Sequence, residues 1–394
     1  MLSQKMYELG SKRSTIREAF EYGKKRAAIV GKENVHDFSI GNPNVPAPKC
    51  VNQAIIDIIN EMESTAIHGY TSAQGDDSVR KAIADSLNRR FDTNFTKDNF
   101  YMTVGAAASL TICLRALYEA GNEFIAFAPY FPEYKCFVEG VGAKLIEVPA
   151  NIADFQINFA EFEKRINENT KGVIVNSPNN PTGVVYSKET IIRLAEVLNK
   201  KSKEYGHPIF IISDEPYREI VFDGVEVPFL TKYYDNTLVC YSFSKALSLP
   251  GERIGYILVP SEAEQHEKLY AAVCGAGRVL GYVNAPSLFQ RVVAKCIDET
   301  SDISIYEENK KLLYNSLTQM GYTCVDPGGT FYLFPRALEE DANKFCEKAK
   351  EFDLLLVPGD DFGCPGHVRI SYCVTTEQIK RSLPAFEKLA KSYN

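Results

Sequence analysis

The sequence predicts an α/β protein, with a large domain built on a mainly parallel central sheet flanked by helices and a smaller α/β domain after it. Three apolar runs, at residues 172–175, 208–212 and 238–241, have the length of buried strands, and polar residues follow each of them. Helical segments such as the one from Glu189 to Tyr205 separate these runs. Strands that alternate with helices favour a parallel sheet, and the ligands of such sheets bind beyond the carboxyl ends of the strands.

The composition is that of an ordinary globular enzyme. A chain of 394 residues is long enough for a large core and for two domains. Apolar residues make up 45% of the chain and charged residues 24%, and the net charge is −7 with both signs interspersed. Because nothing in this charge distribution attracts a polyanion, we expect a mildly acidic soluble protein without a nucleic-acid partner.

The sequence also predicts a cytoplasmic protein without a membrane partner. The N-terminus lacks the continuous apolar core of a secretory signal. The least charged stretch, from Tyr270 to Phe289, is too interrupted for a membrane span, since it contains Gly275, Gly277, Arg278, Gly281 and Pro286. The ten cysteines include no C-x-x-C pair, so we expect reduced thiols in the core and no metal site.

Breaks in the pattern predict the domain boundaries. The segment 38–48 contains three prolines, which indicates a crossing between domains. Beyond Pro286 the chain changes to long charged helices, with apolar runs at 328–334 and 354–359 that read as strands. We therefore predict an N-terminal segment, 1–45, that joins the small domain, a large cofactor-binding domain, 46–285, and a small C-terminal domain, 286–394. Apolar residues at helical spacing after the first crossing are expected to face the core: Val51, Ile55, Ile58, Ile59 and Met62.

The central candidate for chemistry is Lys245, which follows the last of the three apolar runs. Apolar surroundings and the cation of Arg253, eight residues further on, would lower the pKa of this amine and make it a nucleophile. Ser242, Ser244 and Arg253 supply the hydroxyl and guanidinium donors that a phosphate ester needs. A phosphate-bearing carbonyl compound that a lysine holds through a Schiff base is pyridoxal 5'-phosphate (PLP). The alternative is a surface loop that happens to contain Lys and Arg.

The segment from Ser242 to Gly255, with the pattern S-x-S-K-x-x-S-x-x-G-x-R-x-G, resembles the cofactor-lysine signature of the class I/II PLP-dependent aminotransferases. This is the fold-type-I family typified by aspartate aminotransferase, and the resemblance extends from Gly41 to Arg369. It implies a ping-pong, Schiff-base transfer of the amino group of an α-amino acid to a 2-oxo acid. In that reaction Lys245 binds the cofactor covalently and then moves the substrate proton as general base.

Several further residues match positions at which the family contacts PLP. Small residues open a helix at Gly105, Ala106 and Ala107, where backbone amides and the helix dipole favour a phosphate. Asn180, in a segment that resembles N-x-x-N-P-T-G, would donate to the phenolic oxygen of the cofactor together with Tyr217. The match implies that Asp214, in a D-x-x-Y segment, pairs with the pyridine nitrogen and that Phe131 stacks on the ring; core packing is the alternative for Phe131.

The resemblance also implies substrate contacts and a partner subunit. Gly41 would give a backbone contact to the substrate carboxylate, or is merely a turn glycine. Arg369 would clamp that carboxylate together with Asn180, or forms a structural ion pair. Tyr70 matches a tyrosine that reaches the phosphate in the neighbouring subunit, so we expect a homodimer with composite active sites.

The substrate side chain and the reaction type stay open at this stage. Arg278 lies in a glycine-rich segment, where it would bind a second carboxylate and select aspartate or glutamate, or is a solvated or interface arginine. A PLP-dependent carbon–sulfur lyase of the same fold is the alternative enzyme. A PLP-sensing regulator is a further class, but it requires a DNA-binding domain, and the pattern that begins at Gly41 leaves no room for one.

Overall fold

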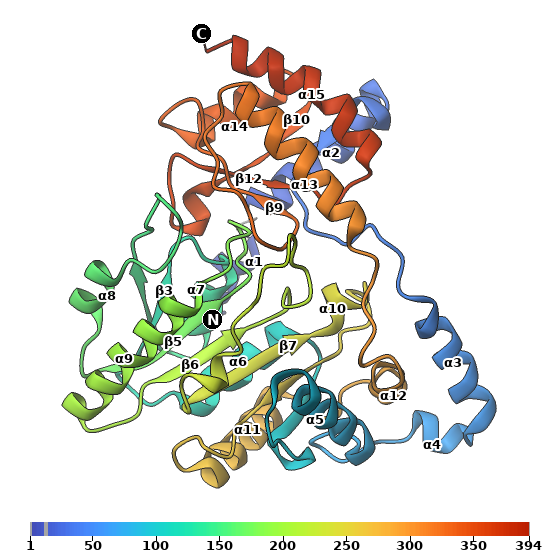
Figure 1. Ribbon diagram of the computed structural model, residues 1–394, viewed down its shortest axis with the longest axis vertical. Helices are drawn as coiled ribbons and strands as arrows, with labels where there is room; N and C mark the ends of the chain where they lie inside the picture. Colours follow the sequence, from blue (N-terminus) through green and yellow to red (C-terminus); the bar gives the residue numbers. More distant parts are fainter. Residues whose placement is uncertain (1, 12–14, 394) are drawn as a thin grey trace.

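The computed structural model describes residues 2–11 and 15–393, which form two lobes (Figure 1). Residue 1 and residues 12–14 of the predicted N-terminal segment lie outside the described residues, as does residue 394. The lower lobe in Figure 1 contains a seven-stranded sheet, and the upper lobe contains short strands covered by helices. Among the described residues, no helix is long and apolar enough to cross a bilayer.

The large sheet has the strand order β2-β8-β7-β6-β5-β3-β4. Its parallel part runs from β7 to β4, whereas β8 is antiparallel to both β7 and β2. The predicted mainly parallel sheet is therefore confirmed, and the three apolar runs lie in its neighbouring strands β5, β6 and β7. The strands are β2 (Phe100–Thr103), β3 (Glu123–Phe127), β4 (Lys144–Val148), β5 (Thr170–Asn176), β6 (Phe210–Asp214), β7 (Thr237–Ser242) and β8 (Gly255–Leu258).

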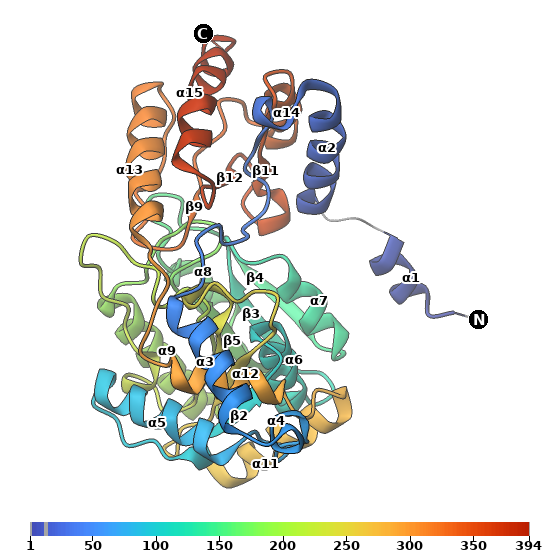
Figure 2. The same ribbon diagram turned by 90° about the vertical axis from the view of Figure 1, so that its right-hand side faces the viewer.

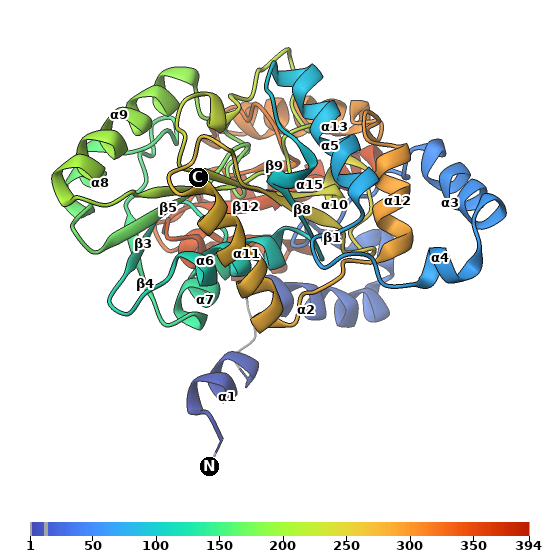
Figure 3. The ribbon, with the colours of Figure 1, turned by 90° about the horizontal axis from the view of Figure 1, so that it is seen from below.

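Helices cover both faces of this sheet, which explains why its strands are apolar throughout. Figure 3 shows α8 and α9 on one side of the sheet and α6, α7 and α11 on the other. Successive residues of β5 point to the two sides: Val173 packs in the core on the α8 and α9 side, and Ile174 packs in the core on the opposite side. The lower-lobe helices are α3 (Lys49–Glu61), α4 (Ser64–His68), α5 (Asp77–Phe91), α6 (Ala106–Leu117), α7 (Glu133–Gly140), α8 (Phe159–Arg165), α9 (Lys188–Tyr205), α10 (Phe243–Ala246), α11 (His266–Leu280) and α12 (Ser287–Lys295).

Local signals end these helices where the sequence predicts. The side chain of Ser187 accepts a hydrogen bond from the amide of Thr190 and caps α9, and Gly206 ends that helix in the left-handed conformation. The result is a helix of fixed length between β5 and β6, which brings the two strands side by side in parallel.

The upper lobe joins the C-terminal third of the chain to part of the N-terminal segment. Strand β1 (His36–Asp37) pairs in parallel with β10 (Leu354–Leu355), and α2 (Thr15–Val30) packs beside β10. A second sheet has the order β11-β12-β9. The remaining elements are β9 (Tyr332–Leu333), β11 (Val357–Pro358), β12 (Val368–Ser371), α13 (Ser304–Gln319), α14 (Ala342–Lys350) and α15 (Thr376–Lys391).

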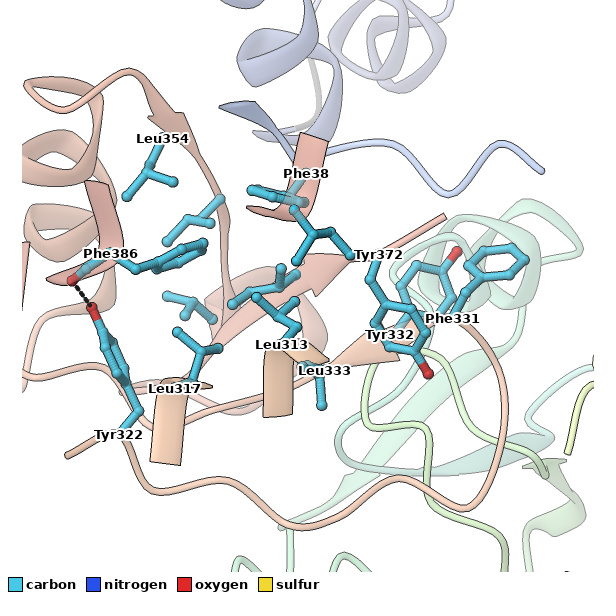
Figure 4. Close-up of a cluster of buried hydrophobic side chains, with 14 of the residues drawn as sticks. Phe38, Leu313, Leu317, Tyr322, Phe331, Tyr332, Leu333, Leu354, Tyr372 and Phe386 are labelled. Carbon is cyan, nitrogen blue, oxygen red and sulfur yellow. Dashed lines mark hydrogen bonds between the residues drawn. The ribbon is translucent and has the colours of Figure 1, made fainter. Parts of the chain in front are cut away.

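One apolar core fixes most of these upper-lobe elements to one another (Figure 4). Phe38, from just beyond β1, packs with Phe386 of α15 at a ring separation of 5.8 Å. Tyr322 donates a hydrogen bond to the backbone carbonyl of Phe386. Because Phe331 and Tyr332 belong to the same cluster, this core also sets the position of the upper-lobe side chains that face the lower lobe.

The structure departs from the sequence prediction or adds to it in three places. Helix α12 packs against α3 and α5 of the lower lobe, although it lies beyond residue 285, where the sequence predicts that the small domain begins; the division into domains stays a prediction. Ile59 is 56% exposed, because the buried face of α3 centres on Val51 and Ile58. The glycine-rich segment around Arg278 is the last two turns of α11, since glycine is tolerated inside a helix that packs closely on α6.

Helix α1 (Gln4–Ser11) projects from the rest of the molecule, as Figure 2 shows. All of its residues are exposed, and the amine of Lys5 donates to the backbone carbonyl of Glu139 at the end of α7. The helix therefore adds nothing to either core.

Candidate active site

Parallel pairing brings the polar ends of β5, β6 and β7 to one edge of the large sheet. Asn176 and Asp214 are register partners, and Ser242 ends β7 next to them. The amide of Asn176 donates to the backbone carbonyl of Asp214 at 2.9 Å and links the two strand ends. Lys245 follows on the one-turn helix α10, which Ser242 caps by accepting from the amide of Ser244.

Lys245 is held between the two lobes. Its amine donates to the carbonyl of Gly41 at 2.8 Å, and it lies 5.3 Å from the ring centre of Phe331 and 5.9 Å from that of Tyr217. Burial lowers its pKa to about 8; the cations of Arg369 and Arg253 act in the same direction and the Cys373 thiol opposes them. The lowered pKa that the sequence predicts is therefore confirmed, with Arg369 as a second contributing cation.

The Asp214 carboxyl group has one satisfied and one unsatisfied oxygen. Oδ2 accepts a hydrogen bond from the Tyr134 hydroxyl at 2.5 Å, whereas Oδ1 is buried and has no partner among the described residues. Burial raises the pKa of Asp214 to about 7, against the hydrogen bond from Tyr134, which lowers it. A buried carboxylate with a free oxygen fits a protonated ring nitrogen, which would supply both the missing donor and the opposite charge.

The predicted phosphate ligands come together at the start of α6. Gly105 has a φ of +96°, and a Cβ atom at this position would lie only 2.7 Å from Nη2 of Arg253. Nη1 of the same guanidinium donates to Ser244 Oγ at 3.4 Å, and Ser244 Oγ lies 2.7 Å from Ser242 Oγ. The first helical hydrogen bond runs from Ser109 to Gly105, so the amides of the intervening alanines, Ala106 and Ala107 among them, are free of such bonds. Amides, hydroxyls and a guanidinium at one helix start fit a phosphate ester.

Arg369, on β12, reaches the same site from the upper lobe. It is 2% exposed, and it donates to Asn180 Oδ1 at 3.2 Å and to the Ser39 carbonyl at 2.6 Å. Both partners are neutral, and Nε is buried without a partner among the described residues. A buried cation with a free donor calls for an anion, so the structural ion pair that the sequence left open does not account for Arg369.

Gly41 is more than a turn residue. A Cβ at this position would overlap the hydroxyl of Tyr332, and its carbonyl accepts from Lys245. The hydroxyl of Tyr332 also lies 3.1 Å from that of Tyr217. The glycine therefore allows the N-terminal segment to pass between an upper-lobe tyrosine and the lysine.

Sequence reasoning missed two tyrosines of this site. Tyr134 binds Asp214, and its only signal was its place one helical turn after Phe131. Tyr332 contacts Tyr217 and Arg369, whose guanidinium lies 4.7 Å from its ring centre. Its only signal was its place in the apolar run 328–334, where an ordinary core residue looks the same.

Three predicted residues are not gathered into this site. Tyr70 is 95% exposed, and Arg278 is exposed on the last turn of α11. Phe131 is half-buried, and its ring lies edge-on to that of Tyr134 at 5.8 Å. Phe131 is therefore connected to Asp214 through Tyr134, which binds the carboxylate. The first two could serve an active site only in another copy of the chain.

Taken together, the fold and the site define an α/β enzyme that uses PLP, because a lysine of lowered pKa, a phosphate seat and a buried carboxylate lie at one sheet edge. A family model described as "Aminotransferase class I and II" matches residues 33–386. The chain belongs to this family, and it is a PLP-dependent aminotransferase.

Relatives and solved structures agree with this assignment. The chain is 29% identical over 399 residues to an aspartate aminotransferase of Thermotoga maritima, and the match covers all of both chains. It is 30% identical over 369 residues to the putative aminotransferase YugH of Bacillus subtilis, and this match covers 89% of the chain and 90% of the relative. A crystal structure of an aminotransferase from Eubacterium rectale has 64% identity and a TM-score of 0.99, with 100% and 99% covered. The aspartate aminotransferase of Thermus thermophilus with maleate has 25% identity and a TM-score of 0.85, with 99% of both chains covered. These relatives are aminotransferases, and none of them supports the carbon–sulfur lyase alternative.

Proposed function

We propose that this aminotransferase takes the amino group from a dicarboxylic α-amino acid, aspartate or glutamate, and passes it to a 2-oxo acid in two half-reactions. The observation that carries the reaction, as distinct from the choice of side chain, is Arg369, a buried guanidinium with neutral partners and a free Nε, set beside Asn180 and near Lys245. A substrate carboxylate there would complete the hydrogen bonding of Arg369.

The cofactor, when bound, supplies the electron sink, and the protein supplies proton transfer and positioning. Lys245 is suited to take the proton from the substrate Cα, because an amine of pKa about 8 is partly neutral at neutral pH. Asp214 holds a negative charge against the ring nitrogen. Burial raises the pKa of Tyr217 well above its usual value, so its hydroxyl stays protonated and donates. Asn180 accepts from Arg369 through Oδ1, which leaves its NH₂ group to donate.

The nature of the substrate side chain is supported by the relatives. Those from Thermotoga maritima and Pyrococcus abyssi are named aspartate aminotransferases, and the second is 29% identical over 391 residues. A second carboxylate needs a second cation, and we assign Arg278 of the partner subunit to it. Arg278 is exposed at the end of α11, close to the exposed Tyr70 segment through Asn284, which donates to the carbonyls of Thr71 and Ser72.

We infer a homodimer from the surface that carries Tyr70 and Arg278. Tyr70 is 95% exposed although it matches a cofactor-binding tyrosine, and large apolar side chains are exposed on α3 and at and after the end of α11: Ile56, Ile59, Val279, Tyr282 and Val283. Exposed large apolar side chains are typical of a surface that another protein covers. In the dimer, Tyr70 would complete the phosphate seat of the partner. We also place the enzyme in the cytoplasm, because its ten cysteines are free thiols.

The test of the reaction is a panel of amino acids assayed against 2-oxoglutarate, pyruvate and oxaloacetate, with initial rates at several concentrations of both substrates. Parallel double-reciprocal lines are expected for a ping-pong reaction, with the highest kcat/KM for aspartate or glutamate. Intersecting lines would overturn the two-half-reaction scheme, and a higher kcat/KM for alanine or an aromatic amino acid would overturn the substrate.

The test of the composite site mixes two inactive variants, Lys245→Ala and Tyr70→Phe. Each heterodimer contains one site with both native residues. Random assortment makes half of the dimers heterodimers, so subunit exchange should restore activity to about a quarter of the native value. A fully active monomer in light scattering would contradict the dimer.

A further inference from the structure

Tyr134 is a buried tyrosine that touches the least satisfied carboxyl group of the site. It is 1% exposed, it lies on the first turn of α7, and its hydroxyl is 2.5 Å from Oδ2 of Asp214. Burial and the charge of Asp214 raise the pKa of Tyr134 well above its usual value. The hydroxyl therefore remains protonated at any pH at which the enzyme works, and it donates to the carboxylate.

We propose that Tyr134 is a positioning residue for the cofactor: it fixes the plane of the Asp214 carboxylate so that Oδ1 is the oxygen left for the ring nitrogen of PLP, and it stabilises the charged form of this group. The inference rests on the proposed role of Asp214. It assigns to Tyr134 no contact with substrate or cofactor.

The geometry supports the orienting role. The backbone of Asp214 is fixed by its pairing with β5 and β7, but the sheet does not fix rotation of the carboxylate. Among the described residues, the only side-chain hydrogen bond of Asp214 comes from Tyr134, and Oδ1 is left without a partner. Since a carboxylate with one bound oxygen has one preferred plane, Tyr134 selects which oxygen is free.

Tyr134 is itself held rigidly. Its ring stacks on Tyr130 at 6.3 Å and 16°, it meets Phe131 edge-on at 86°, and its amide donates to the Phe131 carbonyl at 3.0 Å. Phe131 is the residue expected to stack on the cofactor ring. One short segment, 129–134, would therefore set both the face of the ring and the acceptor for its nitrogen.

The charge around Asp214 gives the hydrogen bond a second role. Asp214 faces Tyr134 from α7, Cys240 from β7, and Glu215 and Tyr217 from its own strand end. The pKa values of Cys240 and Tyr217 are raised, mainly by burial, so both groups are neutral. Glu215 is paired with Arg218 through a 2.5 Å contact, and its residual charge raises the pKa of Asp214. Tyr134 is the group that acts against burial and Glu215, so its loss should raise the pKa of Asp214 further.

The test is Tyr134→Phe, studied first without the cofactor. An infrared titration of the carboxyl C=O band, assigned by subtracting the same titration of Asp214→Asn, measures the pKa of Asp214 directly. Loss of one hydrogen bond to a charged group is expected to raise the midpoint by about one unit from its native value. An unchanged midpoint would overturn the proposal, whatever the role of Asp214 toward PLP.

The second measurement is the dissociation constant of PLP between pH 6 and pH 9. We expect about tenfold weaker binding for Tyr134→Phe at neutral pH and a smaller loss at pH 9, because Asp214 is ionised there in both proteins. In the Asp214→Asn background, Tyr134→Phe should cause no further loss. A loss that does not vary with pH, or that persists in the Asp214→Asn background, would indicate a packing role and overturn the proposal.

The matched control is Tyr130→Phe, which removes a hydroxyl from the neighbouring stacked ring without touching Asp214. It should leave both measurements unchanged, and an equal shift would overturn the assignment to Tyr134. If Tyr134→Phe does not fold, 3-fluorotyrosine at this position alone keeps the ring and strengthens the donor. The Asp214 midpoint should then fall instead of rising, and a midpoint that stays or rises would overturn the proposal.

Discussion

The active site has two halves that differ in how the chain builds them. The lower half consists of Asp214, Lys245 and the phosphate seat at Gly105, all of which follow strands of the large sheet. The upper half consists of Arg369 and Gly41, which come from the two ends of the chain and meet Lys245 between the lobes. Strand pairing in the large sheet fixes the first set, parallel for β6 and β7 and antiparallel for β2, and packing of the upper core on the lower lobe fixes the second.

This difference separates the tasks of the enzyme. Groups at the sheet edge are held by the most regular part of the molecule, and they match the atoms of the cofactor. In the upper half, Arg369 has neutral partners and a free donor, and it matches the substrate carboxylate. Changes in the lower half should therefore lower kcat for all substrates, whereas changes in the upper half should raise KM, and a change at Arg278 should discriminate among substrates.

The largest effect is expected for Lys245→Ala. Removal of the amine eliminates the general base and the covalent link, so transamination should fall by about 10⁴-fold or more, and the link reducible by borohydride should disappear. PLP can remain bound non-covalently, because the phosphate seat is intact. Since the chain contains no tryptophan, cofactor binding can be followed by absorbance and tyrosine fluorescence. Retention of full activity would remove Lys245 from the mechanism.

The next effect is expected for Asp214→Ala at saturating PLP. The loss of the charge opposite the ring nitrogen should lower kcat by about 10³-fold, since each ~1.4 kcal/mol of lost transition-state stabilisation is tenfold. The decrease should be the same for every amino acid, as the comparison requires of the lower half. Near-normal turnover would show that another acid does this work.

Arg369→Ala tests the upper half. Removal of a buried cation that binds the common α-carboxylate should lower kcat/KM by about 10³-fold for all amino acids, mainly through KM, and Arg369→Lys should recover part of it because it keeps the charge but not the fork. Arg381→Lys, on an exposed face of α15, is the control and should be silent. If kcat falls while KM is unchanged, the division between the two halves is wrong.

The smallest and most selective effect is expected for Arg278→Ala. Loss of a charge pair with a second carboxylate should cost ~2–4 kcal/mol in kcat/KM for aspartate and glutamate, but little for alanine or an aromatic amino acid. The measurement is the ratio of kcat/KM values between the two groups of substrates. If all of them fall equally, or none falls, Arg278 does not determine specificity and remains an exposed arginine of α11.

The two halves were not equally visible in the sequence. Asp214 and Lys245 follow short apolar runs, and the rule that ligands bind at the carboxyl ends of parallel strands places them together without any knowledge of contacts. Arg369 looked like an arginine inside an apolar strand, for which a structural ion pair was the alternative explanation. Its neutral partners, Asn180 and Ser39, are 189 and 330 residues away in the sequence, and no local pattern reports them.

The sequence by itself determined the sheet, its helices, the cofactor lysine and the family, because strand and helix periodicity and short motifs are local properties of the chain. The tertiary structure alone decided which oxygen of Asp214 is free, why Gly41 must lack a side chain, that α12 belongs to the lower lobe, and that Tyr70 and Arg278 face outward. Each of these depends on contacts between segments far apart in the chain. Such contacts arise from the packing of whole elements, for which single positions carry no signal.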